Sequence, residues 1–71
     1  MITVKDIADF VEKSVQKALK LSDPIREVGD SMDFIELVNH MEIQFDLVIP
    51  NEQFAKFVTV GDLIFYVAAK V

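Results

Sequence analysis

Residues 30–46 read DSMDFIELVNHMEIQFD, and this segment decides the fold. Asp30 or Ser31 offers a side-chain oxygen of the kind that accepts hydrogen bonds at the start of a helix. Apolar residues then recur at offsets of three and four positions, which predicts one helix ending near Asp46. The apolar stripe consists of Phe34, Leu37, Val38, Met41 and Phe45.

Two further segments carry helix-start signals before an apolar stripe. Thr3 followed by Asp6 predicts a helix over residues 4–20, and Thr59 followed by Asp62 predicts a last helix from residue 59 to about residue 70. Shorter segments connect these two predicted helices to the central one.

The two connecting segments differ in their residue types and in the structure we expect of them. Residues 21–29 contain Ser-Asp-Pro and a glycine, so we expect a loop, which Ile25 and Val28 attach to the core. After Pro50, residues 51–57 have weak periodicity and are expected to form a short third helix.

Composition supports the same architecture. The chain has 71 residues, which predicts one domain over residues 1–71. Its apolar fraction of 52% suffices for a core, and two glycines and two prolines favour helices over a turn-rich β fold. We therefore expect an all-α fold, a small four-helix bundle of three longer helices and a short third one.

The charge distribution limits the possible partners. The net charge is −5 and the pI is near 4.5, which disfavours nucleic acid and anionic membranes and favours basic protein surfaces. From residue 27 to residue 52 there is no Lys or Arg. The acids of that stretch are Glu27, Asp30, Asp33, Glu36, Glu42, Asp46 and Glu52.

Several functions are disfavoured by missing residues. One histidine, no cysteine and no glycine-rich phosphate loop leave no catalytic constellation and no metal cluster, so we expect a protein that is not an enzyme. The longest apolar run, residues 63–69, is too short to span a membrane. We expect a soluble, cytoplasmic monomer without membrane insertion.

A longer string of residues carries a specific signal. It consists of Asp30-Ser31-Met32-Asp33, Glu36-Leu37-Val38, Glu42, Phe45-Asp46, Ile49-Pro50 and Thr59-Val60. This string resembles the acyl carrier protein family, without a gap from about residue 29 to residue 67.

The resemblance implies a covalent cofactor on one serine. In that family the serine of an Asp-Ser-Leu motif carries 4′-phosphopantetheine, derived from coenzyme A, and this serine corresponds to Ser31. Asp30 and Met32 then belong to the attachment motif. A helix N-terminus suits a phosphate ester physically, although the same Asp-Ser pair is also compatible with a plain helix cap.

The resemblance also implies a docking face on the outer side of the central helix. Its partners would be a phosphopantetheinyl transferase and acyl-processing enzymes with basic docking surfaces. The residues expected to bind partners are Asp33, Ile35, Glu36, Asn39, Glu42, Ile43 and Asp46.

The inner side of that helix is expected to adjoin a bound acyl chain. The predicted acyl pocket consists of Phe34, Leu37, Val38, Met41, Ile49, Leu63 and Ile64. Phe34 departs from the smaller residue usual in fatty-acid carriers, so we expect its ring to narrow or reshape the entrance. Asn39 and His40 are further departures, which leave the set of partners open, and the loop before Gly29 is shorter than in typical fatty-acid carriers, which points to a specialised member.

The sequence leaves the pathway open. A carrier for fatty-acid, specialised lipid or polyketide biosynthesis would share every residue named above. A carrier for an aminoacyl or peptidyl pathway is an alternative, as is an unmodified acidic helical module that binds a basic protein.

Overall fold

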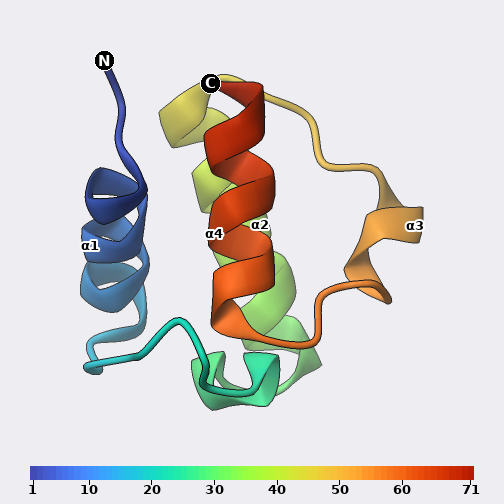
Figure 1. Ribbon diagram of the computed structural model, residues 1–71. Coiled ribbons are helices and arrows are strands. Elements are labelled where there is room, and N and C mark those ends of the chain that lie inside the picture. The colour runs from blue at the N-terminus through green and yellow to red at the C-terminus, as the bar shows by residue number, and fades with distance from the viewer.

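Three long helices pack side by side in the computed structural model, which describes residues 1–71 (Figure 1). They are α1 (Val4–Val15), α2 (Ser31–Phe45) and α4 (Val60–Lys70). The 3₁₀ helix η1 (Ile25–Val28) and the short α3 (Asn51–Phe54) lie in the connections. α2 and α4 run in the same direction and α1 runs opposite to them. All of these elements are helices, which confirms the predicted all-α fold.

All three long helices begin with the same reciprocal pair of hydrogen bonds. The side chain before the helix accepts from a backbone N–H three residues later, and the acid at that later position accepts from the backbone N–H of the first. Each pair satisfies two N–H groups, one of them a helix-end donor without an intrahelical partner. The pairs are Thr3 with Asp6, Asp30 with Asp33, and Thr59 with Asp62.

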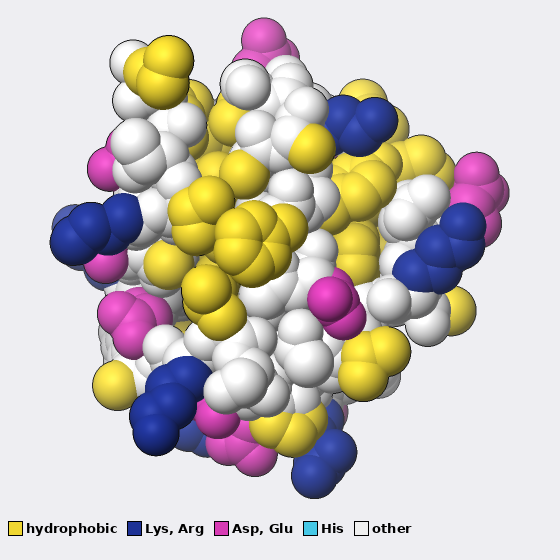
Figure 2. All heavy atoms as spheres, in the orientation of Figure 1, with side chains coloured by type: hydrophobic (Ala, Val, Ile, Leu, Met, Phe, Trp, Pro, Cys, Tyr) yellow, Lys and Arg dark blue, Asp and Glu magenta, His cyan; other side chains and the backbone are white.

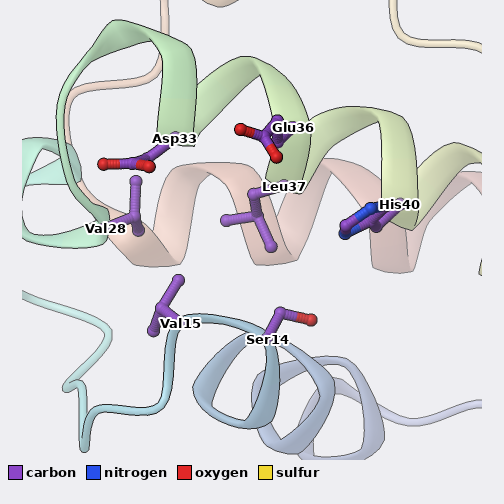
Figure 3. A pocket seen from close by; sticks show the side chains of 7 residues that line it. All are labelled: Ser14, Val15, Val28, Asp33, Glu36, Leu37 and His40. Atoms are coloured by element: carbon purple, nitrogen blue, oxygen red, sulfur yellow. The ribbon is translucent and has the colours of Figure 1, made fainter.

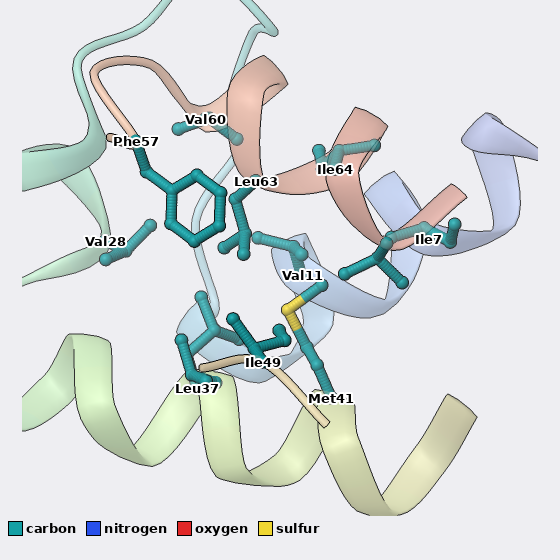
Figure 4. Close-up of a cluster of buried hydrophobic side chains, with 12 residues drawn as sticks. Ile7, Val11, Val28, Leu37, Met41, Ile49, Phe57, Val60, Leu63 and Ile64 are labelled. Carbon is teal, nitrogen blue, oxygen red and sulfur yellow. The ribbon is translucent and has the colours of Figure 1, made fainter. Parts of the chain in front are cut away.

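The core is entirely apolar, and all three long helices contribute to it (Figure 4). No polar or charged side chain is buried, so no desolvated polar group opposes the packing. The buried hydrophobic residues are Ile7, Val11, Val28, Leu37, Val38, Met41, Ile49, Phe57, Val60, Leu63, Ile64 and Val67.

The first helix is shorter than predicted, because it ends at Val15 rather than at residue 20. Gln16 adopts a left-handed conformation with φ 56°, which turns the chain out of the helix. The Glu12 carboxylate then accepts a hydrogen bond of 2.7 Å from the backbone N–H of Leu19. This long-range bond stabilises a non-helical path that local periodicity does not reveal.

α2 ends by the same means, close to its predicted end. Asp46 is left-handed with φ 55°, and the Glu42 carboxylate accepts from the backbone N–H of Ile49 at 2.7 Å. Each of these glutamates therefore fixes the chain seven residues farther on, just outside its own helix.

The connection between α1 and α2 is held against the start of α4. The N–H groups of Val60 and Gly61 donate to the carbonyls of Asp23 and Leu21, both at 2.8 Å, and the Ile25 N–H donates to the carbonyl of Val58. Loop carbonyls thus satisfy two orphan donors of α4. This attachment places η1 beside the start of α2, and the predicted anchoring role of Val28 is confirmed by its burial.

The short third helix was predicted over residues 51–57 but covers only Asn51–Phe54. After it the chain makes tight turns, with the Lys56 N–H donating to the Gln53 carbonyl at 2.9 Å. Leaving the helix at this point allows Phe57 to enter the core, where it is 6% exposed.

The face on which α4 lies in front carries a central group of hydrophobic side chains with charged residues around it (Figure 2). No helix of the structure combines the length and the apolar character that crossing a membrane requires.

The helix-start acids predict how the fold responds to acid. Hydrogen bonds from the Thr59 N–H and then the Val58 N–H lower the pKa of Asp62 from its ordinary value of 3.8, and the bond from the Thr3 N–H lowers the pKa of Asp6. A carboxyl group whose pKa falls on folding stabilises the fold above its unfolded pKa, and this stabilisation is lost as the pH falls through the folded pKa.

We therefore expect Asp62→Ala to lower the free energy of unfolding at about pH 7, and the gap from the parent to narrow between about pH 5 and about pH 2. Denaturant unfolding at several pH values measures this gap. Asp9→Ala, which removes an exposed carboxylate that pairs only with Lys5, is the control. A gap for Asp62→Ala that does not change with pH would contradict the expectation.

Candidate functional site

The start of α2 combines a reciprocal pair of hydrogen bonds with an exposed serine. The Asp30 Oδ1 accepts from the Asp33 N–H at 3.0 Å, and the Asp33 Oδ2 accepts from the Asp30 N–H at 3.1 Å. Ser31 is the first residue of the helix, directly after the capping residue. Its position is thereby fixed by bonds on both sides.

Gly29 makes this arrangement possible. Its φ of 129° and ψ of −163° lie in a region that is essentially restricted to glycine. A Cβ at this position would also collide with the carboxylate and Cβ of Asp33. Gly29 thus provides both the turn and the space that the reciprocal hydrogen bonds need.

Ser31 itself is exposed, and its hydroxyl is not used in any hydrogen bond of the fold. The backbone N–H groups of Ser31 and Met32 have no partner in the chain either, because they precede the first donor of the helix, Phe34. Free N–H groups at the positive end of the helix dipole favour an oxyanion attached to this hydroxyl.

A groove of about 330 Å³ adjoins Ser31. Residues from η1, the start of α2 and α3 line it: Ile25, Arg26, Gly29, Asp30, Ser31, Phe34 and Phe54. Sequence reasoning missed Arg26 and Phe54 here and assigned Ile25 only to the core. Nothing in the local sequence identifies them, since three separate segments meet only in the folded chain.

The seven residues of the predicted acyl pocket divide into two groups. Phe34 is half-buried and lines the groove beside Ser31. The other six are buried in the core (Figure 4), and none of them lines this groove: Leu37, Val38, Met41, Ile49, Leu63 and Ile64.

The predicted docking residues lie mostly on the outside of α2. Ile35 and Ile43 are 46% and 81% exposed, and Met32 of the predicted attachment motif, next to them, is 68% exposed, which is a high exposure for large apolar side chains. The polar members Asp33, Glu36, Asn39 and Asp46 are exposed as well. Glu42 differs, because it is half-buried and one of its carboxylate oxygens is bonded to the N–H of Ile49.

A second cavity of about 270 Å³ lies between α1, η1 and α2 (Figure 3). Asp33, Glu36 and His40 line it along α2, and Val15 and Leu37 provide apolar surface from the two helices. The two carboxylates Asp33 and Glu36 therefore line a hollow of the surface with no Lys or Arg among its lining residues.

Comparison with known proteins bears directly on this site. The family described as a phosphopantetheine attachment site matches residues 4–67, which include the whole α2 start and its groove. The chain belongs to this family. The cofactor of the family is a covalently attached 4′-phosphopantetheine, and the residues present fit it, because the site combines a free serine hydroxyl with unpaired helix N–H groups.

Curated relatives point the same way. The acyl carrier protein of Helicobacter pylori is 41% identical over 62 residues, which are 86% of this chain and 80% of the relative. The acyl carrier protein of Clostridium acetobutylicum is 37% identical over 68 residues, which are 93% of this chain and 88% of the relative.

The geometry at Gly29 makes a testable prediction. We expect Gly29→Ala to destabilise the fold by about 1–3 kcal/mol, because the new Cβ meets Asp33 and the backbone conformation is strained. Chemical denaturation measures the loss, and Ala55→Gly, at a right-handed position after α3, is the comparison for a glycine–alanine exchange without such strain. An unchanged stability of Gly29→Ala would contradict this account of the turn.

Proposed function

We propose that this protein is an acyl carrier that bears 4′-phosphopantetheine on Ser31 and presents bound acyl groups to partner enzymes. The observation that carries the proposal is the exposed, unbonded Ser31 hydroxyl at the first position of α2. When bound, the cofactor supplies a thiol on a flexible arm, which carries the acyl group as a thioester.

The chain's own contribution is to hold and orient the attachment point. The N–H groups of Ser31 and Met32, which have no partner in the chain, would stabilise the negative charge of a phosphodiester attached to Ser31. The bonds between Asp30 and Asp33 keep this helix end from fraying. The hydroxyl therefore stays accessible while its backbone stays fixed.

Partner enzymes are expected to dock on the outer face of α2, next to Ser31. Exposed apolar side chains of Met32, Ile35 and Ile43 would seat the partner, and the exposed carboxylates of Asp33 and Glu36 would attract basic residues. Glu42 is half-buried and its carboxylate accepts from the Ile49 N–H, so we assign it to holding the loop after α2. Asp33 also accepts a backbone hydrogen bond, from the Asp30 N–H, but its side chain is exposed to a partner.

The acyl class rather than an aminoacyl or peptidyl class is favoured by the relatives, which are acyl carrier proteins. The partner enzymes that dock on this carrier determine whether it serves fatty-acid, lipid or polyketide synthesis.

The central prediction concerns modification of Ser31. Incubation of the unmodified protein with coenzyme A and a broad-specificity phosphopantetheinyl transferase should add the mass of one phosphopantetheine, measured by intact-protein mass spectrometry. Ser31→Ala should gain nothing, while Ser22→Ala, which removes an exposed serine of the preceding loop, should be modified like the parent. No mass gain in the parent would overturn the proposal.

The docking face makes a separate prediction. Glu36→Lys should slow the modification several-fold at low ionic strength, because it reverses a charge beside the attachment site. Adding salt should reduce the difference, since screening weakens the attraction of a basic partner. Glu52→Lys on α3 changes the net charge equally and is the control; equal rates for the two variants would argue against docking on α2.

A further inference from the structure

One basic residue lies at the groove beside Ser31. Arg26 on η1 lines this groove, and no other lining residue carries a positive charge. η1 itself lies beside the start of α2 (Figure 1). From residue 27 to residue 52 the chain has no Lys or Arg, so Arg26 is the basic residue nearest to Ser31 in the sequence.

The fold makes no use of the Arg26 guanidinium. Arg26 is exposed, and it takes part in neither of the two ion pairs of the chain. The adjacent acid Glu27 is bound to Lys17 instead, with Nζ and Oε1 2.6 Å apart. The Asp30 carboxylate accepts from the Asp33 N–H. The donors of the guanidinium are therefore available to an anion from outside the chain.

The backbone that carries Arg26 is fixed, although its side chain is not. The Arg26 carbonyl accepts a hydrogen bond of 3.0 Å from the Gly29 N–H, and the Ile25 N–H donates to the carbonyl of Val58 at 2.9 Å. Val28 of the same turn is buried in the core. The point from which the Arg26 side chain extends is thus tied to the turn that leads into Ser31.

The other charges at this place are negative. Asp30 lines the groove together with Ser31, and the exposed Asp33 lies one turn of backbone away. Each of these carboxylates accepts a backbone N–H, and neither is paired with a cation. A phosphodiester on Ser31 adds a further negative charge beside them, and like charges repel. A cation at the groove offsets that repulsion.

We propose that Arg26 binds the phosphate of the prosthetic group on Ser31 and so holds the base of the phosphopantetheine arm. The inference rests on the proposed function and adds a positioning residue to it. A guanidinium is planar and donates two parallel N–H bonds to two oxygens of one phosphate. The same phosphate would also receive the N–H groups of Ser31 and Met32 at the start of α2.

Arg26 is the only arginine of the chain, which makes its side chain directly measurable. Its Nε–Hε group gives one resonance in a proton–nitrogen correlation spectrum of the labelled protein. We expect this resonance to shift when coenzyme A and a broad-specificity transferase load Ser31. The shift should shrink in high salt, because screening weakens an exposed ion pair. Ser31→Ala treated in the same way should keep the unloaded resonance.

The phosphorus resonance of the loaded protein gives a second readout, from the phosphate itself. In Arg26→Gln it should differ from that of the parent, and Arg26→Lys, which keeps the charge, should move it back toward the parent's value. Lys13→Gln is the matched control. It also removes an exposed positive charge, but Lys13 lines a cavity with Phe45 at the other end of α2, so the phosphorus resonance should match the parent's.

Either of two results overturns the inference. One is an Arg26 Nε–Hε resonance that stays in place when Ser31 is loaded. The other is a phosphorus resonance that is the same in loaded Arg26→Gln as in the loaded parent. The first measurement uses the parent protein alone, so it decides the question even if a variant loads or folds poorly.

Mass spectrometry separates a failure of this inference from a failure of the proposed function. If Ser31 gains no phosphopantetheine, the carrier function fails and the role of Arg26 fails with it. If Ser31 is fully loaded and the Arg26 resonance does not move, the carrier function holds and only the role of Arg26 is wrong.

Discussion

The reciprocal hydrogen bonds between Asp30 and Asp33 are the constraint on which the rest of the structure depends. They fix the first turn of α2, and Gly29 is the residue whose backbone allows them to form without a collision. With this turn fixed, Ser31 is held at the surface and the apolar side of α2 faces the core. One local arrangement therefore sets both the packing of the central helix and the position of the Ser31 hydroxyl.

The buried side and the exposed side of α2 have different roles. The buried side chains of Leu37, Val38 and Met41 contribute to a core without polar groups, and the opposite side exposes acids and large apolar residues. Packing of the buried side in the core holds the helix, and with it the backbone of the exposed side, in place. Beside Ser31, aromatic rings from α2, α3 and α4 pack edge-to-face through Phe57 and join these three helices.

The starts of the three long helices were predictable from the sequence, whereas the ends of α1 and α3 were not, for a physical reason. Each start depends on residues three positions apart, so Thr59 and Asp62 reveal it locally. The end of α1 depends on a bond from the Leu19 N–H to Glu12, seven positions apart, and on a left-handed Gln16 that no glycine announces. The attachment-site motif was likewise evident in the sequence.

The groove was not evident, because Ile25, Phe34 and Phe54 come from three segments that only the tertiary fold brings together.

The proposed function requires that the prosthetic group is attached at Ser31 and not at either of the other two serines, Ser14 and Ser22. Tandem mass spectrometry of proteolytic peptides from the protein isolated from its own cells tests this most directly. We expect phosphopantetheine on the peptide that contains Ser31; its presence on any other residue, or only unmodified Ser31 peptide, would show that Ser31 is not the attachment site.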